Sequence, residues 1–158
     1  MEHKLRLRRW NKKDCRTLYD WRMDPLVRYY SLSSEAFPYD KHKEWFDNFM
    51  NNPNGFGFIL EDFDIPVAQI RFEKTSIDGY YNVSISTAPK QTRKGYGSIL
   101  LEAACKDKEL LSVAKFFVAE IIDSNIISQS IFEKNNFSKT GETVYAGRRV
   151  YLYKRPAR

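Results

Sequence analysis

Residues 80–104 constrain the fold more than any other part of this 158-residue chain. A β-rich run at residues 80–87 ends at an Ala-Pro pair, a short basic glycine turn covers residues 91–97, and apolar residues at helical spacing follow. A strand, a turn and a helix in this order leave unpaired backbone N–H groups at the helix N-terminus, where the helix dipole also favours an anion. Gly95 and Gly97 let the backbone approach a phosphate closely. The segment therefore predicts a phosphate site.

Two well-known glycine loops do not fit this turn. A P-loop needs four residues between its glycines and a following Lys-Ser/Thr pair, whereas one residue separates Gly95 from Gly97. A dinucleotide-binding fingerprint needs a third glycine three residues after the second, and that position is Leu100. Taken alone, the turn is equally compatible with an ordinary strand-to-helix connection.

The turn resembles the acetyl-CoA loop of the GNAT acetyltransferases, whose pattern is Gln/Arg-x-x-Gly-x-Gly/Ala between a strand and a helix. The first position of that pattern is Thr92 here, Gln91 lies one place earlier, and Arg93 and Lys94 supply the basic character. Most of the hydrogen bonds to a pyrophosphate would come from backbone N–H groups. The replacement of Gln/Arg by Thr92 therefore leaves the loop able to bind it.

A second segment, residues 119–137, resembles the later GNAT pattern Asn-x-x-Ser/Ala-x-x-aliphatic-Tyr-Glu-Lys-x-Gly-Phe. Asn136 stands where the pattern has glycine, and asparagine tolerates the left-handed conformation that ends a helix there. Two matches in the right order identify the chain as a member of the GNAT family over nearly its whole length. The resemblance implies a single domain, residues 1–158, of the α+β (mixed α/β) class, with a mostly antiparallel sheet flanked by helices.

The resemblance also implies acetyl-CoA as cosubstrate. Backbone groups of residues 84–87 would pair with the pantetheine arm, and Asn125 would hydrogen bond to it while capping a helix. The residues expected to bind the cosubstrate are Ile85, Ser86, Thr87, Thr92, Arg93, Lys94, Gly95, Tyr96, Gly97, Ser98, Asn125, Ser128 and Phe132.

Acetyl transfer to an amine needs a base for the amine, a polarised carbonyl and a proton for the leaving thiolate. Two residues common in the family are absent: a glutamate in the strand before the loop is Asn82, and the tyrosine of the late helix is Phe132, which cannot donate a proton. Glu120 is the expected base, because the apolar run before it predicts burial and a raised pKa. An outward position on an edge strand is nearly as compatible with the pattern.

The acceptor is suggested by residues 20–25 and 40–46, which resemble a GNAT branch that acetylates the 4-amino group of nucleotide-linked amino sugars, as in the pseudaminic acid pathway. The resemblance implies nucleotide contacts from Arg22 and His42, and Arg71 is expected to meet a phosphate in the same cleft. Alternatively, Arg22 pairs with a neighbouring aspartate and His42 lies on a helix surface. Similar segments occur in ribosomal-protein N-terminal acetyltransferases, so a protein amine is an alternative acceptor, and a catalytically silent CoA-binding module is a second alternative.

Composition limits which other classes of protein this chain can belong to. Hydrophobic residues make up 42% of the chain and the net charge is +6, with charges scattered and no aromatic–basic motif, so no nucleic-acid partner is expected. No stretch has the apolar length of a membrane span or of a signal peptide, and no metal site is expected. Cys15 and Cys105 lack a CxxC partner, which predicts reduced thiols in a cytoplasmic protein. The expected partner is a small-molecule amine, and the expected state is a monomer or a homodimer paired through an exposed strand near residues 150–154.

Overall fold

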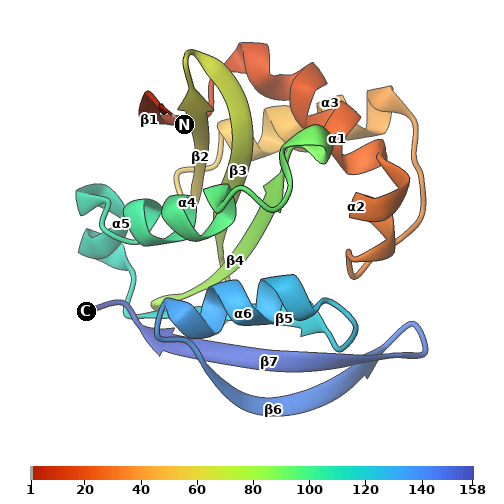
Figure 1. Cartoon of the computed structure of the whole chain (residues 1–158). Coiled ribbons are helices and arrows are strands. Elements are labelled where there is room, and N and C mark those ends of the chain that lie inside the picture. The colour runs from red at the N-terminus through yellow and green to blue at the C-terminus, as the bar shows by residue number, and fades with distance from the viewer. Residues whose placement is uncertain (1) are drawn as a thin grey trace.

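The computed structural model describes residues 2–158, and its core is a seven-stranded sheet in the order β1-β2-β3-β4-β5-β7-β6 (Figure 1). Every neighbouring pair is antiparallel except β4 and β5, which run parallel. This arrangement confirms the expected mixed, mostly antiparallel sheet. The strands are β1 (Leu5–Arg9), β2 (Gly55–Asp62), β3 (Ile65–Lys74), β4 (Tyr80–Thr87), β5 (Phe116–Ile122), β6 (Ser138–Tyr145) and β7 (Arg148–Pro156).

Helices cover both faces of the sheet. The helices are α1 (Cys15–Met23), α2 (Pro25–Tyr29), α3 (Tyr39–Met50), α4 (Tyr96–Ala104), α5 (Lys108–Val113) and α6 (Ile126–Lys134), with short 3-10 turns at Lys12–Asp14 and Pro89–Gln91. α1 and α3, red to orange in Figure 1, pack with Trp10 and Ile59 in one apolar cluster. α4, α5 and α6 pack over the other face in a larger cluster that includes Phe72, Phe117 and Leu100. Fully burying a phenylalanine or leucine contributes roughly 1.5–3 kcal/mol, so these two clusters hold the sheet in place.

The parallel pair opens after a short run. β4 and β5 pair only at Tyr80 with Phe116, Tyr81 with Phe117 and Asn82 with Val118. Beyond that point β4 stays paired with β3, and β5 stays paired with β7. In the part of the chain that the structure describes, residues 83–87 therefore have no strand partner on the β5 side, which leaves a row of backbone groups free along the opening.

Strand order corrects one expectation. β7 lies between β5 and β6, so residues 150–154 form an interior strand rather than a dimer edge. The edge strand on this side of the sheet is β6, and most of its residues are exposed. The two cysteines, Cys15 and Cys105, are buried and free. Within residues 2–158, every helix is too short or too polar to cross a membrane.

Candidate active site

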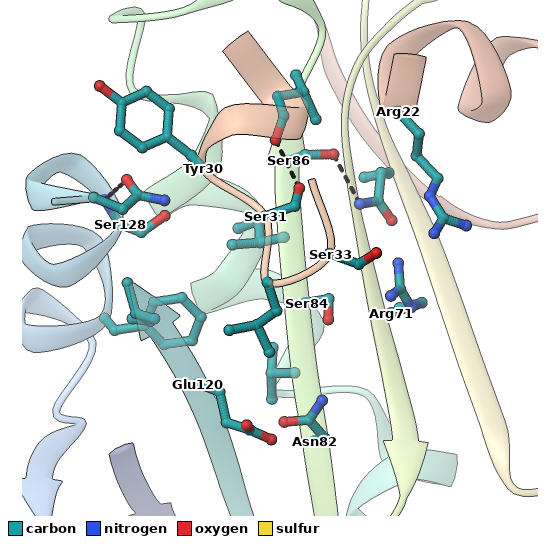
Figure 2. A pocket seen from close by; sticks show the side chains of 18 of the residues that line it. Arg22, Tyr30, Ser31, Ser33, Arg71, Asn82, Ser84, Ser86, Glu120 and Ser128 are labelled. Atoms are coloured by element: carbon teal, nitrogen blue, oxygen red, sulfur yellow. Dashed lines mark hydrogen bonds between the residues drawn. The ribbon is translucent and has the colours of Figure 1, made fainter. Parts of the chain in front are cut away.

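A cleft of about 290 Å³ lies where β4 and β5 diverge (Figure 2). Its walls come from α1, the segment after α2, strands β3 to β5, and the first turns of α6. Most of the side chains around it are polar, and the polar ones are Arg22, Tyr30, Ser31, Ser33, Glu35, Gln69, Arg71, Asn82, Ser84, Ser86, Glu120, Asn125 and Ser128.

Strand register explains the polar floor of the cleft. Arg71 of β3 pairs with Ser84 of β4, so their side chains lie on the same face. Asn82 pairs with Val118 of β5, and alternation along both strands then places Ser84 and Glu120 on that face too. Arg71 and Glu120 therefore lie on opposite sides of β4, and the separation of β5 from β4 beyond Asn82 widens the gap between them. A cation and a carboxylate thus face one cleft from its two sides.

Arg22 and Arg71 form the positive side of the cleft. Both guanidinium groups lie near the Trp45 ring, at 5.0 and 5.1 Å from its centroid, and Arg22 lies 4.7 Å from the Phe37 ring centroid. Arg71 donates to Glu73 at 2.7 Å, whereas Arg22 makes no ion pair within the described residues. Burial, and then repulsion from Arg71, lowers the pKa of Arg22 to about 10, so the side chain remains cationic at neutral pH. An uncompensated, half-buried guanidinium of this kind is suited to an anionic ligand.

The alternative in which Arg22 pairs with a neighbouring aspartate does not hold. Asp20 pairs with Arg16 at 3.1 Å, and Asp24 accepts from the backbone of Leu26 and Val27 at the start of α2. The aromatic faces therefore hold Arg22 in the cleft, with its charge available.

Glu120 lies in the cleft but is exposed, so the expected burial is wrong. The apolar run before it does form a central strand, and Phe117 and Ala119 are buried. The next outward-facing position falls where β4 has already separated from β5, and the opening exposes the carboxylate. The edge-strand alternative is also wrong, because β5 lies between β4 and β7.

His42 is not in the cleft. It is fully buried on α3 among Tyr19, Phe37 and Trp45, and its Nε2 lies 3.0 Å from the carbonyl oxygen of Cys15. Burial is the main cause that lowers its pKa. Neither the expected nucleotide contact nor a place on the helix surface is available to it. The resemblance implied a ligand contact, but the position of His42 on α3 turns its ring into the aromatic cluster.

The glycine turn carries an unusual run of free donors. Arg93 and Gly95 both adopt left-handed backbone angles, with φ of 63° and 80°. Within the described residues, no backbone N–H from residue 92 to residue 98 donates a hydrogen bond. Successive N–H groups that turn around left-handed residues at a helix N-terminus form an anion-binding concavity. The turn adjoins the cleft through the end of β4 but does not line it.

Two side chains and one glycine assigned to the cosubstrate make contacts within the protein instead. The Tyr96 hydroxyl donates to buried Asp62, Ser98 accepts from Asn135 at 3.2 Å, and Gly97 faces α6, where an added Cβ would lie 3.0 Å from the Cδ1 of Ile131. Their backbone N–H groups remain available to a ligand, but the Tyr96 and Ser98 side chains are engaged elsewhere.

The remaining assigned residues lie in three places. Ile85, Ser86, Asn125, Ser128 and Phe132 line the cleft, where the Asn125 side chain also accepts from the backbone N–H of Ser128 as the cap of α6. Thr87 ends β4 just before the turn. Thr92, Arg93, Lys94 and Gly95 lie exposed in the turn.

Sequence reasoning missed the segment at residues 30–37, which forms the outer wall of the cleft through Tyr30, Ser33 and Glu35 (Figure 2). It has no periodicity and no motif, so no local signal marked it. Gln69 was also missed, although its position two residues before Arg71, opposite alternating serines in a central sheet, is a signal that could have been used.

Comparisons with known proteins agree with this geometry. Residues 4–138 match the family model described as an acetyltransferase (GNAT) domain. The structure is similar to spermidine N-acetyltransferase from Vibrio cholerae in complex with CoA and spermine, with a TM-score of 0.84, 17% identity, and coverage of 97% of this chain and 95% of that chain. An N-acetyltransferase from Staphylococcus aureus gives a TM-score of 0.82 at 17% identity, with coverage of 98% and 99%. No curated protein sequence matches significantly.

A splayed parallel pair, a glycine turn with free N–H groups and a polar cleft between them define an acyl-CoA-dependent transferase fold. The chain belongs to the GNAT acetyltransferase family. It is an N-acetyltransferase, and acetyl-CoA is its acetyl donor.

Proposed function

We propose that this enzyme acetylates a primary amine on an anionic small molecule, and that the preferred acceptor is a nucleotide-linked 4-amino-4,6-dideoxy sugar. The observation that carries this proposal is Arg22, a cleft guanidinium that no carboxylate among residues 2–158 pairs with. It lies next to Arg71 and across the cleft from Glu120. A sugar nucleotide carries a diphosphate at one end and an amine at the other. The cleft offers a cationic side and a carboxylate side in the same arrangement.

A polyamine fits this cleft less well. Spermidine carries several positive charges and no negative one, so it would bring further cations beside Arg22 and Arg71, where like charges repel. The similarity to a spermidine acetyltransferase is at 17% identity and concerns the fold. The two arginines therefore favour an anionic acceptor over a polycation.

Acetyl-CoA would lie along the opening between β4 and β5. Its pyrophosphate would accept from the backbone N–H groups of residues 92–98, beside Arg93 and Lys94, and its pantetheine arm would pair with the free edge of β4 near Asn125. These positions supply donors and charge where the cosubstrate carries acceptors.

Glu120 would act as the base. An acceptor amine arrives protonated at neutral pH, and the exposed carboxylate can take a proton from it and pass the proton to solvent. Phe132 cannot protonate the leaving thiolate, and its ring is buried against Phe137. Water entering the cleft would supply that proton.

The test is thiol release from acetyl-CoA across a panel of UDP- and dTDP-linked 4-amino sugars, spermidine, aminoglycosides and short peptides. We expect turnover on a nucleotide sugar. Glu120→Gln should lower kcat by about 100-fold or more, while Glu44→Gln, on the exposed face of α3, should leave it unchanged.

Acceptor recognition is tested separately. Arg22→Met should raise the acceptor KM by about 10- to 100-fold, the effect expected from losing a charged hydrogen-bonding partner, with little change in the acetyl-CoA KM. Turnover confined to peptides would replace the nucleotide sugar with a protein amine. CoA binding without turnover of any amine would instead indicate a catalytically silent module.

A further inference from the structure

Asn82 and Glu120 share one end of the cleft (Figure 2). Asn82 is the last residue of β4 that pairs with β5, opposite Val118, and Glu120 follows two positions later on the same face of β5. The strands separate directly after this pair. The two side chains therefore flank the point at which the sheet opens.

The Oδ1 atom of Asn82 is buried and accepts no hydrogen bond within the described residues. Buried amide oxygens in folded proteins nearly always have a donor, because an unpaired one destabilises the fold. In Figure 2 the oxygen of Asn82 lies on the side of Glu120. Two groups that accept and do not donate, an amide oxygen and a carboxylate, thus face each other from adjacent strands.

Within the described residues, no side chain or backbone group donates a hydrogen bond to Asn82 Oδ1. Arg71 donates to Glu73 at 2.7 Å, and the guanidinium of Arg22 lies against the rings of Phe37 and Trp45. A ligand group that satisfies both Asn82 and Glu120 must bring at least two N–H or O–H donors to this end of the cleft. A primary amine, with three protons when charged and two when neutral, meets this requirement.

We propose that Asn82 is an amine-binding residue that works with Glu120: Asn82 Oδ1 accepts one N–H of the acceptor amine while the Glu120 carboxylate accepts another. This rests on the proposed function, because it takes Glu120 as the base. The retained N–H···O contact fixes the rotation of the amine about its C–N bond and so aims the nitrogen lone pair.

The proton balance follows from these two contacts. The ammonium transfers one proton to Glu120, which becomes a neutral carboxyl group and releases that proton to solvent. The amine nitrogen then forms a C–N bond to the acetyl carbon as the C–S bond breaks, the electron pair of that bond stays on sulfur, and the nitrogen loses a second proton. The products are an amide and a thiol, with one proton gained by sulfur.

An amide at this position suits a single base better than a second carboxylate would. A second carboxylate beside Glu120 would repel it, and each would disfavour the charged form of the other. Asn82 offers an oxygen acceptor of similar shape without the charge.

The test compares Asn82→Ala and Asn82→Asp with the wild-type enzyme, using the amine that gives the highest turnover in the thiol-release panel. Asn48→Ala, an exposed asparagine of α3, is the control. Asn82→Ala should lower kcat/KM for the amine by about 10- to 100-fold, as expected for one lost hydrogen bond to a charged group. The KM for acetyl-CoA should stay within about twofold, because Asn82 contacts the acceptor side.

Asn82→Asp keeps the oxygen acceptor and adds a charge. It should retain more activity than Asn82→Ala at alkaline pH. The acidic limb of its pH–rate profile should move to higher pH, because two neighbouring carboxylates repel and disfavour each other's charged forms. The other charged groups lining the cleft, Arg22, Arg71 and Glu35, are the same in every variant.

Three results would overturn the assignment, each in a variant whose melting temperature shows it to be folded. The first is a kcat/KM of Asn82→Ala within about threefold of wild type, and the second is a loss confined to the acetyl-CoA KM. The third is an Asn82→Asp enzyme as inactive as Asn82→Ala at every pH. Turnover of peptides alone by the wild-type enzyme would overturn the nucleotide-sugar acceptor but not Asn82, which the same variants then test on the peptide amine. A wild-type enzyme that acetylates no amine would overturn both.

Discussion

The Tyr96 hydroxyl donates a hydrogen bond to Asp62 Oδ2 at 2.6 Å and so fastens the first residue of α4 to the last residue of β2. The Nδ1 of His3 lies 2.6 Å from the same oxygen, and the backbone N–H of Lys4 donates to Oδ1 at 2.9 Å. Because α4 begins directly after Gly95, this contact also fixes where the glycine turn meets the sheet.

Tyr96→Phe should therefore weaken acetyl-CoA binding indirectly, because the Tyr96 hydroxyl bonds to Asp62 and not to the ligand. We expect the acetyl-CoA KM to rise by about 3- to 10-fold and the melting temperature to fall by about 3 °C, as for one lost hydrogen bond. The acceptor KM at saturating acetyl-CoA should not change. Steady-state kinetics and calorimetry would check this, with Tyr145→Phe on the exposed β6–β7 hairpin as control. An unchanged acetyl-CoA KM would show that the turn holds its shape without this contact.

Asp62 should also make stability depend on pH. The hydrogen bond from Tyr96, then those from His3 and Lys4, lowers the pKa of Asp62 to about 2. A lowered carboxyl pKa stabilises the fold fully above the ordinary value near 4, and this contribution is lost as the pH falls from about 4 towards 2. The difference in melting temperature between wild type and Asp62→Asn should therefore be largest above pH 4 and shrink towards pH 2. A difference that is constant with pH would contradict this assignment.

The glycine turn offers a test of backbone conformation by itself. Gly95 has a φ of 80°, and an added Cβ would meet nothing within 4 Å, so Gly95→Ala introduces only backbone strain. We expect a loss of about 1 kcal/mol in the free energy of unfolding and weaker acetyl-CoA binding. Gly95→Asn should recover part of both, because asparagine tolerates the left-handed conformation. Gly141→Ala, where an added Cβ meets Leu152 at 3.8 Å, is the matched control in chemical denaturation. Equal effects of alanine and asparagine at position 95 would argue against strain as the cause.

The sequence predicted those features that neighbouring residues determine, and it failed for those that distant elements determine. The turn at residues 91–97 and the cap at Asn125 are set by neighbouring residues, and both have the expected local structure. The burial of His42 and the exposure of Glu120 are set by distant elements, the aromatic cluster around α3 and the separation of β4 from β5. The expectation for Glu120 rested on the apolar run before it, and that for His42 on the resemblance of a short segment. Neither carries information on such distant contacts, and both expectations failed for that reason.

The outer wall of the cleft depends on the longest-range of these contacts. Arg148, at the start of β7, donates to the carbonyl oxygens of Tyr29 and Ser31, and its guanidinium lies 5.2 Å from the Tyr29 ring centroid. A cation that binds the last carbonyls of a helix stabilises its C-terminus, here that of α2. The contact therefore holds the segment at residues 30–37 against the cleft.

Arg148→Ala should release that segment and leave the cosubstrate side intact. We expect the acceptor KM to rise by about 3- to 10-fold, as for one or two lost hydrogen bonds, with the acetyl-CoA KM unchanged. Hydrogen exchange of residues 30–37 should become faster, because fewer contacts oppose local opening. The neighbouring Arg149→Ala, which removes only an exposed ion pair with Glu142 at 3.8 Å, is the control and should match wild type in both measurements. Faster exchange with an unchanged acceptor KM would mean that this wall does not position the acceptor, whereas a change in both ties the β6–β7 hairpin to acceptor binding.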